Sequence, residues 1–592
     1  MTAVLVDDTP VGEWDPQVQG YLEACLGVER LARISEALTR PPLATCIRVN
    51  TLLTTAQSLL ERLPAALSAE DRALLEANPH KPYIHPQLPE VILVPGSGPH
   101  EIDYSCAGSK EVIVGRLAGE AIMRGAHLFV PGTLALSTGI ARGDLVAVAV
   151  GVEVSGTNNN NSKWGMTRGT LLGVDPVRDA QLPDRSRLYI GVGRTELSRV
   201  EFFRNTSGLA VSMQQRVFRT VGCAGLLPGE MMLQNLPSFV AAKVLAPQPG
   251  MRVLDMCAAP GGKTTAIAQL MSNKGEVVAL DRSHVKARGI RQLAEELGIT
   301  CVQAYKMDAT RAVLRRQPGE HSHDPQSSAA REAAAPTGSA LQNGTCSSQP
   351  LSDLAAVDSV DPPRIAARAA QEAAEQDSCS RQPSSCEADA GSEGRISNGA
   401  LNGLVQANQP SERLLQRIER KSKGRIARGL DPGIFAQLPE GKEPTVSGFE
   451  PESFDCVLLD APCSALGLRP RLVHRQTMAE LRGTASYQRK LLDAAVQLVK
   501  PGGTLVFSTC TINPGENEAN VLYVLERYPF MKLVPQEPRL GGPGLAGKVA
   551  LPDGSRLRLL SEEDAALVQR FDPAAPLDTI GFFVAKFQKV ES

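Results

Sequence analysis

The stretch Val253-Leu-Asp-Met-Cys-Ala-Ala-Pro-Gly-Gly-Lys-Thr-Thr265 lies at the centre of the predicted fold. The apolar segment 251–254 has the length of a buried strand, and 264–271 carries apolar residues at helical spacing. Between them is a turn of two alanines, a proline and two glycines. A strand, a turn without bulky side chains and a helix N-terminus form a concave site lined with backbone N–H groups, which predicts a polar ligand.

Two common phosphate-binding motifs do not match this turn. A P-loop requires a glycine five residues before the Gly-Lys pair, and Cys257 occupies that position. A dinucleotide fingerprint requires G-x-G-x-x-G, which the segment 258–262 does not supply. The turn therefore indicates a different ligand.

Three further strands are predicted, and an acid stands at or near the end of each. They are Glu276-Val-Val-Ala-Leu-Asp281, Cys301-Val-Gln-Ala-Tyr-Lys-Met-Asp308 and the strand before Asp460. Ligands of a doubly wound sheet bind at the carboxyl ends of its strands, and Asp281 lies at the right spacing to bond a ribose hydroxyl pair. Such a row of acids suits a nucleoside that carries a cationic group, which indicates S-adenosyl-L-methionine. The alternative is a plain α/β sheet whose acids only cap helices.

Three motifs resemble those of the Nop/Sun RNA cytosine-5 methyltransferases, in both order and spacing. They are Asp255-Met-Cys-Ala-Ala-Pro-Gly-Gly-Lys-Thr264, Asp460-Ala-Pro-Cys-Ser464 and Ser508-Thr-Cys-Thr511. The resemblance implies an α/β fold with a Rossmann-like, doubly wound methyltransferase domain that uses S-adenosyl-L-methionine. It also implies the cofactor-binding residues, which are Cys257, Ala258, Ala259, Pro260, Gly261, Gly262, Lys263, Asp281, Asp308 and Asp460.

Two cysteines at strand ends are candidate catalytic groups. Cytosine C5 is a poor nucleophile until a thiolate adds at C6, so the reaction needs one activated cysteine. The residues alone leave Cys463 and Cys510 both open, and DNA cytosine-5 methyltransferases use a Pro-Cys like Pro462-Cys463. The Nop/Sun resemblance implies that Cys510 attacks, Cys463 helps release the methylated RNA, and Asp460 assists protonation at N3. Lys263 is expected to lower a thiol pKa or to orient the base, and no metal is expected.

The chain divides into three predicted regions. Residues 1–108 form an N-terminal α/β RNA-recognition region, in which Arg48-Val-Asn-Thr51 resembles a segment of the family's RNA-binding part or is an ordinary packed strand. Residues 109–205 show short strands with glycine turns, which predict a small β-barrel and resemble an RNA-binding PUA domain. Residues 206–592 form the methyltransferase domain.

A compositional break at 315–448 interrupts the methyltransferase domain. This segment is rich in Ala, Ser, Gln, Glu and Pro and holds one aromatic residue, Phe435. So little apolar area cannot offset the entropy of ordering, which predicts a disordered insertion. The basic stretch 411–428 is the one part expected to form a helix.

A PUA domain placed ahead of the methyltransferase resembles one subgroup of the family, the sixth Sun-domain methyltransferase. Gln536-Glu-Pro and Arg570-Phe-Asp-Pro573 match that subgroup as well. The resemblance implies a tRNA partner, held by its acceptor stem and CCA end and methylated at the cytosine next to the discriminator base. The alternatives are an enzyme for another RNA, such as ribosomal RNA, and a non-catalytic RNA-binding protein. A pure binding module would need none of the thiols.

Charge and cysteine usage bound the remaining possibilities. The formal net charge is −2 and the pI about 6.5, so RNA contacts must come from local basic patches rather than a global field. Twelve cysteines occur without a C-x-x-C pair, which argues against a zinc site and favours reduced intracellular thiols. No targeting peptide or membrane-length apolar run is visible. We expect a cytoplasmic monomer with neither a membrane nor a DNA partner.

Overall fold

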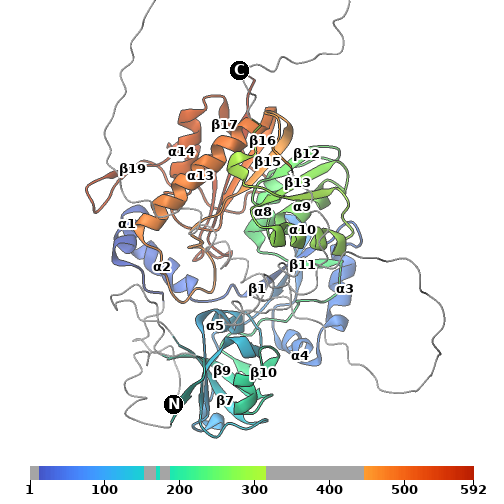
Figure 1. The fold of residues 1–592 in the computed structure, drawn as a ribbon, viewed down its shortest axis with the longest axis vertical. Coiled ribbons are helices and arrows are strands. Elements are labelled where there is room, and N and C mark those ends of the chain that lie inside the picture. Colours follow the sequence, from blue (N-terminus) through green and yellow to red (C-terminus); the bar gives the residue numbers. More distant parts are fainter. Residues whose placement is uncertain (1–11, 152–167, 174–186, 315–445, 592) are drawn as a thin grey trace, which may run out of the picture.

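The structure is a computed structural model that describes residues 12–151, 168–173, 187–314 and 446–591. Within these ranges the chain forms three large sheets and one small hairpin of β18 (Lys548–Ala550) and β19 (Arg556–Arg558). The largest sheet and its helices occupy the upper part of the molecule in Figure 1, and a sheet formed mostly by residues 111–216 lies below it.

The largest sheet has the strand order β14-β13-β12-β15-β16-β21-β17, and β20 pairs with β21. In this order, the strands β14, β13, β12, β15 and β16 all run parallel to one another, and β21 is antiparallel to β16. The strands are β12 (Arg252–Asp255), β13 (Glu276–Asp281), β14 (Val302–Lys306), β15 (Phe454–Asp460), β16 (Val499–Thr509), β17 (Met531–Leu533), β20 (Gln569–Phe571) and β21 (Phe582–Lys589). The predicted Rossmann-like α/β domain is confirmed.

Helices cover both faces of this sheet because its strands are apolar on both sides. Leu254 and Leu459 pack with helices α13 (Met478–Leu498) and α14 (Glu518–Arg527), whereas Val253 and Leu458 pack with the other helix layer. That layer holds α8 (Leu236–Val244), α9 (Gly262–Leu270) and α10 (His284–Glu296). The short α15 (Glu562–Leu567) packs with the first group. Figure 1 shows α13 and α14 well apart from α8, α9 and α10.

The N-terminal region contributes an antiparallel sheet of order β11-β1-β3-β2. Its elements are β1 (Ala44–Val49), β2 (Tyr83–His85), β3 (Leu88–Pro95) and β11 (Met231–Leu233), with α3 (Ala56–Ala66) and α4 (Ala69–Ala77) beside them. The helix pair α1 (Pro16–Leu26) and α2 (Val28–Leu38) packs instead on the methyltransferase domain, where Leu22 and Leu31 share a core with Ile512. This region is therefore joined to the methyltransferase by packing as well as by the chain.

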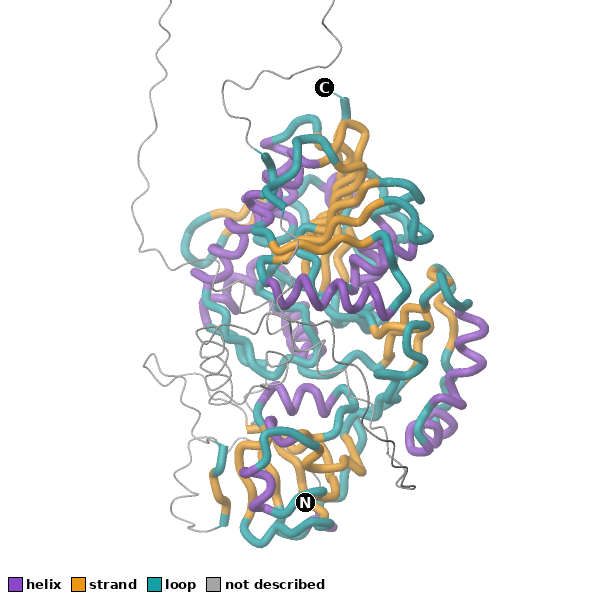
Figure 2. Tube along the Cα trace, turned by 45° about the vertical axis from the view of Figure 1, so that its right-hand side comes forward, coloured by secondary structure: helices purple, strands orange, loops and turns teal. Residues whose placement is uncertain are grey.

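The third sheet is mixed, with the order β5-β10-β9-β7-β4-β6-β8. Its strands are β4 (Glu111–Val114), β5 (Leu128–Phe129), β6 (Thr133–Ser137), β7 (Leu145–Gly151), β8 (Thr170–Leu172), β9 (Arg187–Thr195) and β10 (Leu209–Arg216), with helices α5 (Arg116–Met123) and α7 (Arg199–Arg204). Figure 2 shows it as a separate group of short strands around its own core. Strand β10 lies wholly beyond the predicted boundary at 205, and the PUA assignment stays a prediction.

The predicted insertion at 315–448 falls almost wholly on residues outside the described ranges. Its two ends meet in the structure, because the Leu314 N–H donates to the Phe449 carbonyl (2.9 Å) and the Phe449 N–H donates to the Ala312 carbonyl (2.7 Å). A connection that leaves and returns at one point can be long without disturbing the sheet. Among the helices in the described ranges, none combines the length and hydropathy that crossing a bilayer requires.

Candidate active site

A cavity of about 640 Å³ opens where the three sheets approach one another. Its wall includes Cys46 from β1, Ala121 from α5 and Lys263 from α9. A cavity of this size matches the range of ligand and cofactor sites. All three predicted regions therefore contribute to one site.

The glycine turn after β12 forms one side of this cavity. The Met256 N–H donates to the Leu458 carbonyl (3.0 Å) and the Ala258 N–H donates to the Leu280 carbonyl (2.9 Å), which ties the turn to both neighbouring strands. Gly261 has φ +106° and precedes the first residue of α9. A side chain there would be strained, and its Cβ would lie 3.1 Å from Leu293. The turn is thus open on the side that faces the cavity and fixed on the side that is bonded to the neighbouring strands.

The predicted cofactor residues divide into three groups. Those that line the cavity are Cys257, Ala259, Pro260, Lys263, Asp281 and Asp460. Ala258 and Gly262 line a small adjoining cavity of about 50 Å³, and Gly261 borders neither. Asp308 also lines neither of them. Its carboxylate accepts from the backbone N–H (3.1 Å) and the hydroxyl (2.7 Å) of Thr310, as a helix cap does.

Two carboxylates flank the turn, one buried and one half-buried. Asp255 is fully buried and accepts a hydrogen bond from the Thr264 hydroxyl (2.7 Å), and its burial raises the pKa of this carboxyl to about 7. Asp281 accepts from the Ser283 N–H (2.9 Å) and faces the cavity. Burial raises the pKa of Asp281 as well. Asp281 is therefore the acid placed to meet a polar ligand.

The two candidate cysteines lie side by side. Cys510 directly follows β16, and Cys463 stands in the loop after β15. Their Sγ atoms are 3.3 Å apart, and both residues line the cavity. Cys463 is only 4% exposed, whereas Cys510 is half-buried. A substrate in the cavity would therefore have easier access to Cys510.

An ion pair stands beside the thiols. Lys263 Nζ lies 2.7 Å from the Asp460 carboxylate, whose other oxygen accepts from the Ser508 hydroxyl (2.7 Å). Burial lowers the pKa of Lys263, but Asp460 outweighs that effect and leaves the pKa raised. The interaction of Lys263 with Cys510 acts in the same direction. Lys263 is therefore an ammonium group paired with Asp460 and close to Cys510.

The pKa of the Cys463 thiol is raised well above its usual value. The first cause is its hydrogen bond with Cys510, followed by burial and the nearby carboxylate of Glu516. Both neighbours favour a protonated Cys463. The two thiols thus differ in exposure and in the charges that face them.

Sequence reasoning missed the role of Arg48. This residue is 1% exposed, and its guanidinium donates to Gln234 Oε1 (2.9 Å), Thr265 Oγ1 (2.8 Å) and the Gly262 carbonyl. Arg48 therefore supports the cofactor turn from behind, and of its two expected roles the packed strand is the one observed. A buried partner so far along the chain leaves no signal in local sequence patterns.

Arg168 is a basic residue near strand β8, and its guanidinium donates to the carbonyls of Phe202 (3.2 Å) and Asn205 (2.7 Å). Within the described ranges, no cluster of three or more His, Cys, Asp or Glu side chains is placed to hold a metal ion.

Comparisons with known proteins identify the family. Residues 242–322 and 401–588 match the family model described as 16S rRNA methyltransferase RsmB/F. The chain is 43% identical to the rRNA (cytosine-C(5))-methyltransferase NOP2C of Arabidopsis thaliana, over 98% of this chain and 91% of that protein. The chain belongs to the Nop/Sun family of RNA cytosine-5 methyltransferases. The predicted enzyme class and cofactor, S-adenosyl-L-methionine, are confirmed.

Two further relatives extend the likeness over the whole chain. The tRNA (cytosine(72)-C(5))-methyltransferase NSUN6 of Mus musculus is 31% identical over 98% of this chain and 96% of its own length. A crystal structure of NSun6 from Pyrococcus horikoshii with SFG, an S-adenosylmethionine analogue, superposes with a TM-score of 0.59. It is 24% identical and covers 98% of this chain and 99% of that one, so it shows the same fold.

The geometry fits S-adenosyl-L-methionine. The glycine turn leaves room for a ligand against the backbone, and Asp281 offers a half-buried carboxylate at the end of β13. When bound, the cofactor supplies the activated methyl group. Asp281 and the Cys257–Lys263 turn would hold it, beside the ion pair and the thiols that line the same cavity.

Proposed function

We propose that this Nop/Sun enzyme forms 5-methylcytosine in tRNA, at the acceptor-stem cytosine next to the discriminator base, with Cys510 as the attacking thiolate. The observation that supports this chemistry best is the thiol pair, with 3.3 Å between the two Sγ atoms on the wall of the common cavity. Either cysteine alone would be an ordinary buried residue. Two sulfurs beside a charged lysine suit a reaction that forms and then breaks one covalent bond.

The surroundings of the two sulfurs favour Cys510 as the nucleophile. It is the more exposed of the pair, and the ammonium of Lys263 lies close enough to interact with it. Cys463 faces Glu516 and hydrogen-bonds Cys510, so it retains its proton. Charge and access therefore support Cys510 as the attacking thiol and Cys463 as its protonated neighbour.

The reaction can be written with this chain's own groups. The Cys510 thiolate adds to C6 of cytosine, and the electron pair of the C5–C6 bond becomes available at C5 for the methyl group. Asp460 bonds the ring and assists protonation at N3. Loss of the C5 proton then lets the S–C6 bond break and returns the thiolate, a step that Cys463 assists. General acid–base and nucleophilic catalysis are combined in one small site.

The RNA-binding side of the proposal rests on the other two regions. Residues 109–205 act as a PUA domain and residues 1–108 as an RNA-recognition region. They hold the acceptor stem and CCA end while the target base turns out of its stack. Both regions contribute to the cavity wall, and the tRNA specificity named for mouse NSUN6 supports this substrate. We place the enzyme in the cytoplasm as a monomer, which a cell-fractionation and light-scattering measurement would check.

Transfer of labelled methyl from S-adenosyl-L-methionine to purified tRNA, followed by bisulfite mapping, tests the target. Methylation at the acceptor-stem cytosine is expected. Cys510→Ala should abolish transfer, and Cys463→Ala should trap a covalent protein–RNA adduct that survives denaturing electrophoresis. An adduct that accumulates in Cys510→Ala instead would reverse the two roles.

A second candidate target is ribosomal RNA. It is favoured by the 43% identity to NOP2C of Arabidopsis thaliana, which is named an rRNA methyltransferase. Total RNA from cells with and without the active enzyme separates the two. A bisulfite signal confined to rRNA would replace the tRNA assignment and leave the chemistry unchanged.

A further inference from the structure

Glu516 is a fully buried carboxylate in the loop that carries Cys510, between β16 and α14, and its side chain reaches the Cys463 loop. From the Cys463 loop it accepts hydrogen bonds from both the N–H (2.9 Å) and the hydroxyl of Ser464. From the Cys510 loop it accepts one from Asn513 Nδ2 (2.8 Å). One side chain therefore spans the two loops.

The contacts around Glu516 continue to the residues that flank each cysteine. Gln488 Nε2 donates both to Glu516 (2.9 Å) and to the carbonyl of Pro462, which precedes Cys463 (2.9 Å). The Ser464 hydroxyl also lies 2.8 Å from Thr511 Oγ1, next to Cys510. The backbone is thus held on both sides of Cys463, with a direct bridge to the other loop.

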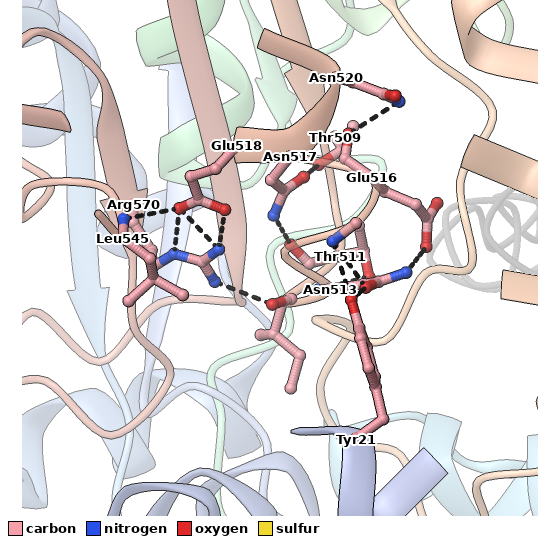
Figure 3. Close-up of polar contacts among 12 residues, drawn as sticks. Tyr21, Thr509, Thr511, Asn513, Glu516, Asn517, Glu518, Asn520, Leu545 and Arg570 are labelled. Carbon is pink, nitrogen blue, oxygen red and sulfur yellow. Dashed lines mark hydrogen bonds and ion pairs between the residues drawn. The ribbon is translucent and has the colours of Figure 1, made fainter. Parts of the chain in front are cut away.

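The orientation of Asn513 is fixed from the N-terminal helix pair. Its Oδ1 accepts from the Tyr21 hydroxyl (2.7 Å) and from the Gly515 N–H (3.0 Å), so its amide nitrogen must face Glu516. Figure 3 shows the hydrogen bonds that link Tyr21 to Asn513 and Asn513 to Glu516, with the Glu518–Arg570 ion pair beside them. With its oxygen already bonded, Asn513 can only donate towards Glu516, so the network requires an acceptor at that position.

We propose that Glu516 is a positioning residue that sets the distance between Cys463 and Cys510. The proposal rests on the proposed function of the thiol pair, but the distance between the two sulfurs can be measured without any RNA. A carboxylate suits this task because it accepts from four donors at once, whereas an amide accepts through only one of its two atoms.

Glu516→Gln is the sharpest substitution, because it preserves shape and removes one acceptor. An amide nitrogen in place of Oε2 would face the Ser464 N–H, and in place of Oε1 it would face Asn513 Nδ2, so either orientation opposes at least one donor that cannot become an acceptor. The loops should then separate. A displacement of about 1 Å can slow a reaction between positioned groups by up to about a hundredfold.

The probe is diamide, which takes two electrons and two protons from a thiol pair, leaving a disulfide, and is reduced to its hydrazine form. The rate at which the Cys463–Cys510 disulfide forms in the full chain is followed by mass spectrometry of its peptides. Wild-type protein should react fast, and Glu516→Gln should react at least about tenfold more slowly. Ser464→Ala removes only the hydroxyl bridge and should react about threefold more slowly than wild type. It tests the same proposal if Glu516→Gln does not fold.

Glu518→Gln is the matched control. Glu518 is also fully buried at the start of α14, but its carboxylate bonds Arg570 and the Leu545 N–H and touches neither Ser464 nor Asn513. Its thiol pair should react at the wild-type rate. A wild-type rate in Glu516→Gln and Ser464→Ala, or equal slowing in Glu518→Gln, would overturn the positioning role. Absence of methyl transfer in wild-type protein with a fast disulfide would instead count against the proposed function alone.

Discussion

Replacement of Arg48 by lysine tests how the N-terminal sheet supports the cofactor turn. Both side chains carry one positive charge in water, but the ammonium is more strongly hydrated, so burying it costs at least as much as burying the guanidinium. The guanidinium makes three hydrogen bonds to oxygen, to Gln234, Gly262 and Thr265. A lysine ammonium on its flexible stem is a point charge that would keep about one of them. Two lost bonds at about 1.5 kcal/mol each predict a loss of about 3 kcal/mol.

Urea denaturation of wild type and Arg48→Lys measures this loss, and calorimetry measures binding of S-adenosyl-L-methionine. Because Arg48 holds the carbonyl of Gly262 at the start of α9, we expect cofactor affinity to fall by about tenfold, or 1.4 kcal/mol. Arg252→Lys is the control, because Arg252 pairs with Glu276 (2.6 Å) at a part-exposed site where such pairs contribute about 1 kcal/mol or less. Equal effects of the two substitutions, or unchanged affinity in Arg48→Lys, would refute this account.

Three other perturbations test the charges of the site. Lys263→Met breaks the 2.7 Å pair with Asp460, and we expect the free energy of unfolding to fall by about 2 kcal/mol. The fall in kcat should be larger than the fall in cofactor affinity. An unchanged kcat would contradict the role given to Lys263. Arg570→Met leaves the carboxylate of Glu518 buried without its partner and should destabilise by about 3–5 kcal/mol in urea denaturation. The raised pKa of Asp255, about 7, means that the folded state binds a proton that the unfolded state releases, so this group's stabilisation is present below about pH 4 and is lost as pH rises to about 7. Asp255→Asn should remove that slope of about 1.4 kcal/mol per pH unit, and an identical pH profile would exclude it.

The sequence predicted the parts of the site that lie within single strand–turn units. The turn at 255–264 and the acids Asp281 and Asp460 follow buried strands, and parallel strands bring their carboxyl ends to one edge. Cys463 and Cys510 follow two strands that prove to be neighbours, β15 and β16. Local periodicity was enough because each of these residues is placed by its own strand.

The sequence could not predict the partners that hold these residues in place. Arg48 reaches Gly262 across 214 positions, and Tyr21 reaches Asn513 across 492. Asp308 also ends a predicted strand, yet it caps the turn that follows and lies outside the cavity. Whether an acid caps its own helix or faces a ligand depends on side-chain directions that strand periodicity does not specify.

The amino-acid order by itself determined the class of reaction, because the motifs at 255–264, 460–464 and 508–511 resemble those of the Nop/Sun enzymes in order and spacing. Only the tertiary structure decided how the two sulfurs differ. The two sulfurs differ in the charge that faces them, because Lys263 lies close to Cys510 and Glu516 lies close to Cys463. The packing of separate elements brings these groups together. Electrostatic influence depends on distance through space, and distance through space is a property of the folded chain.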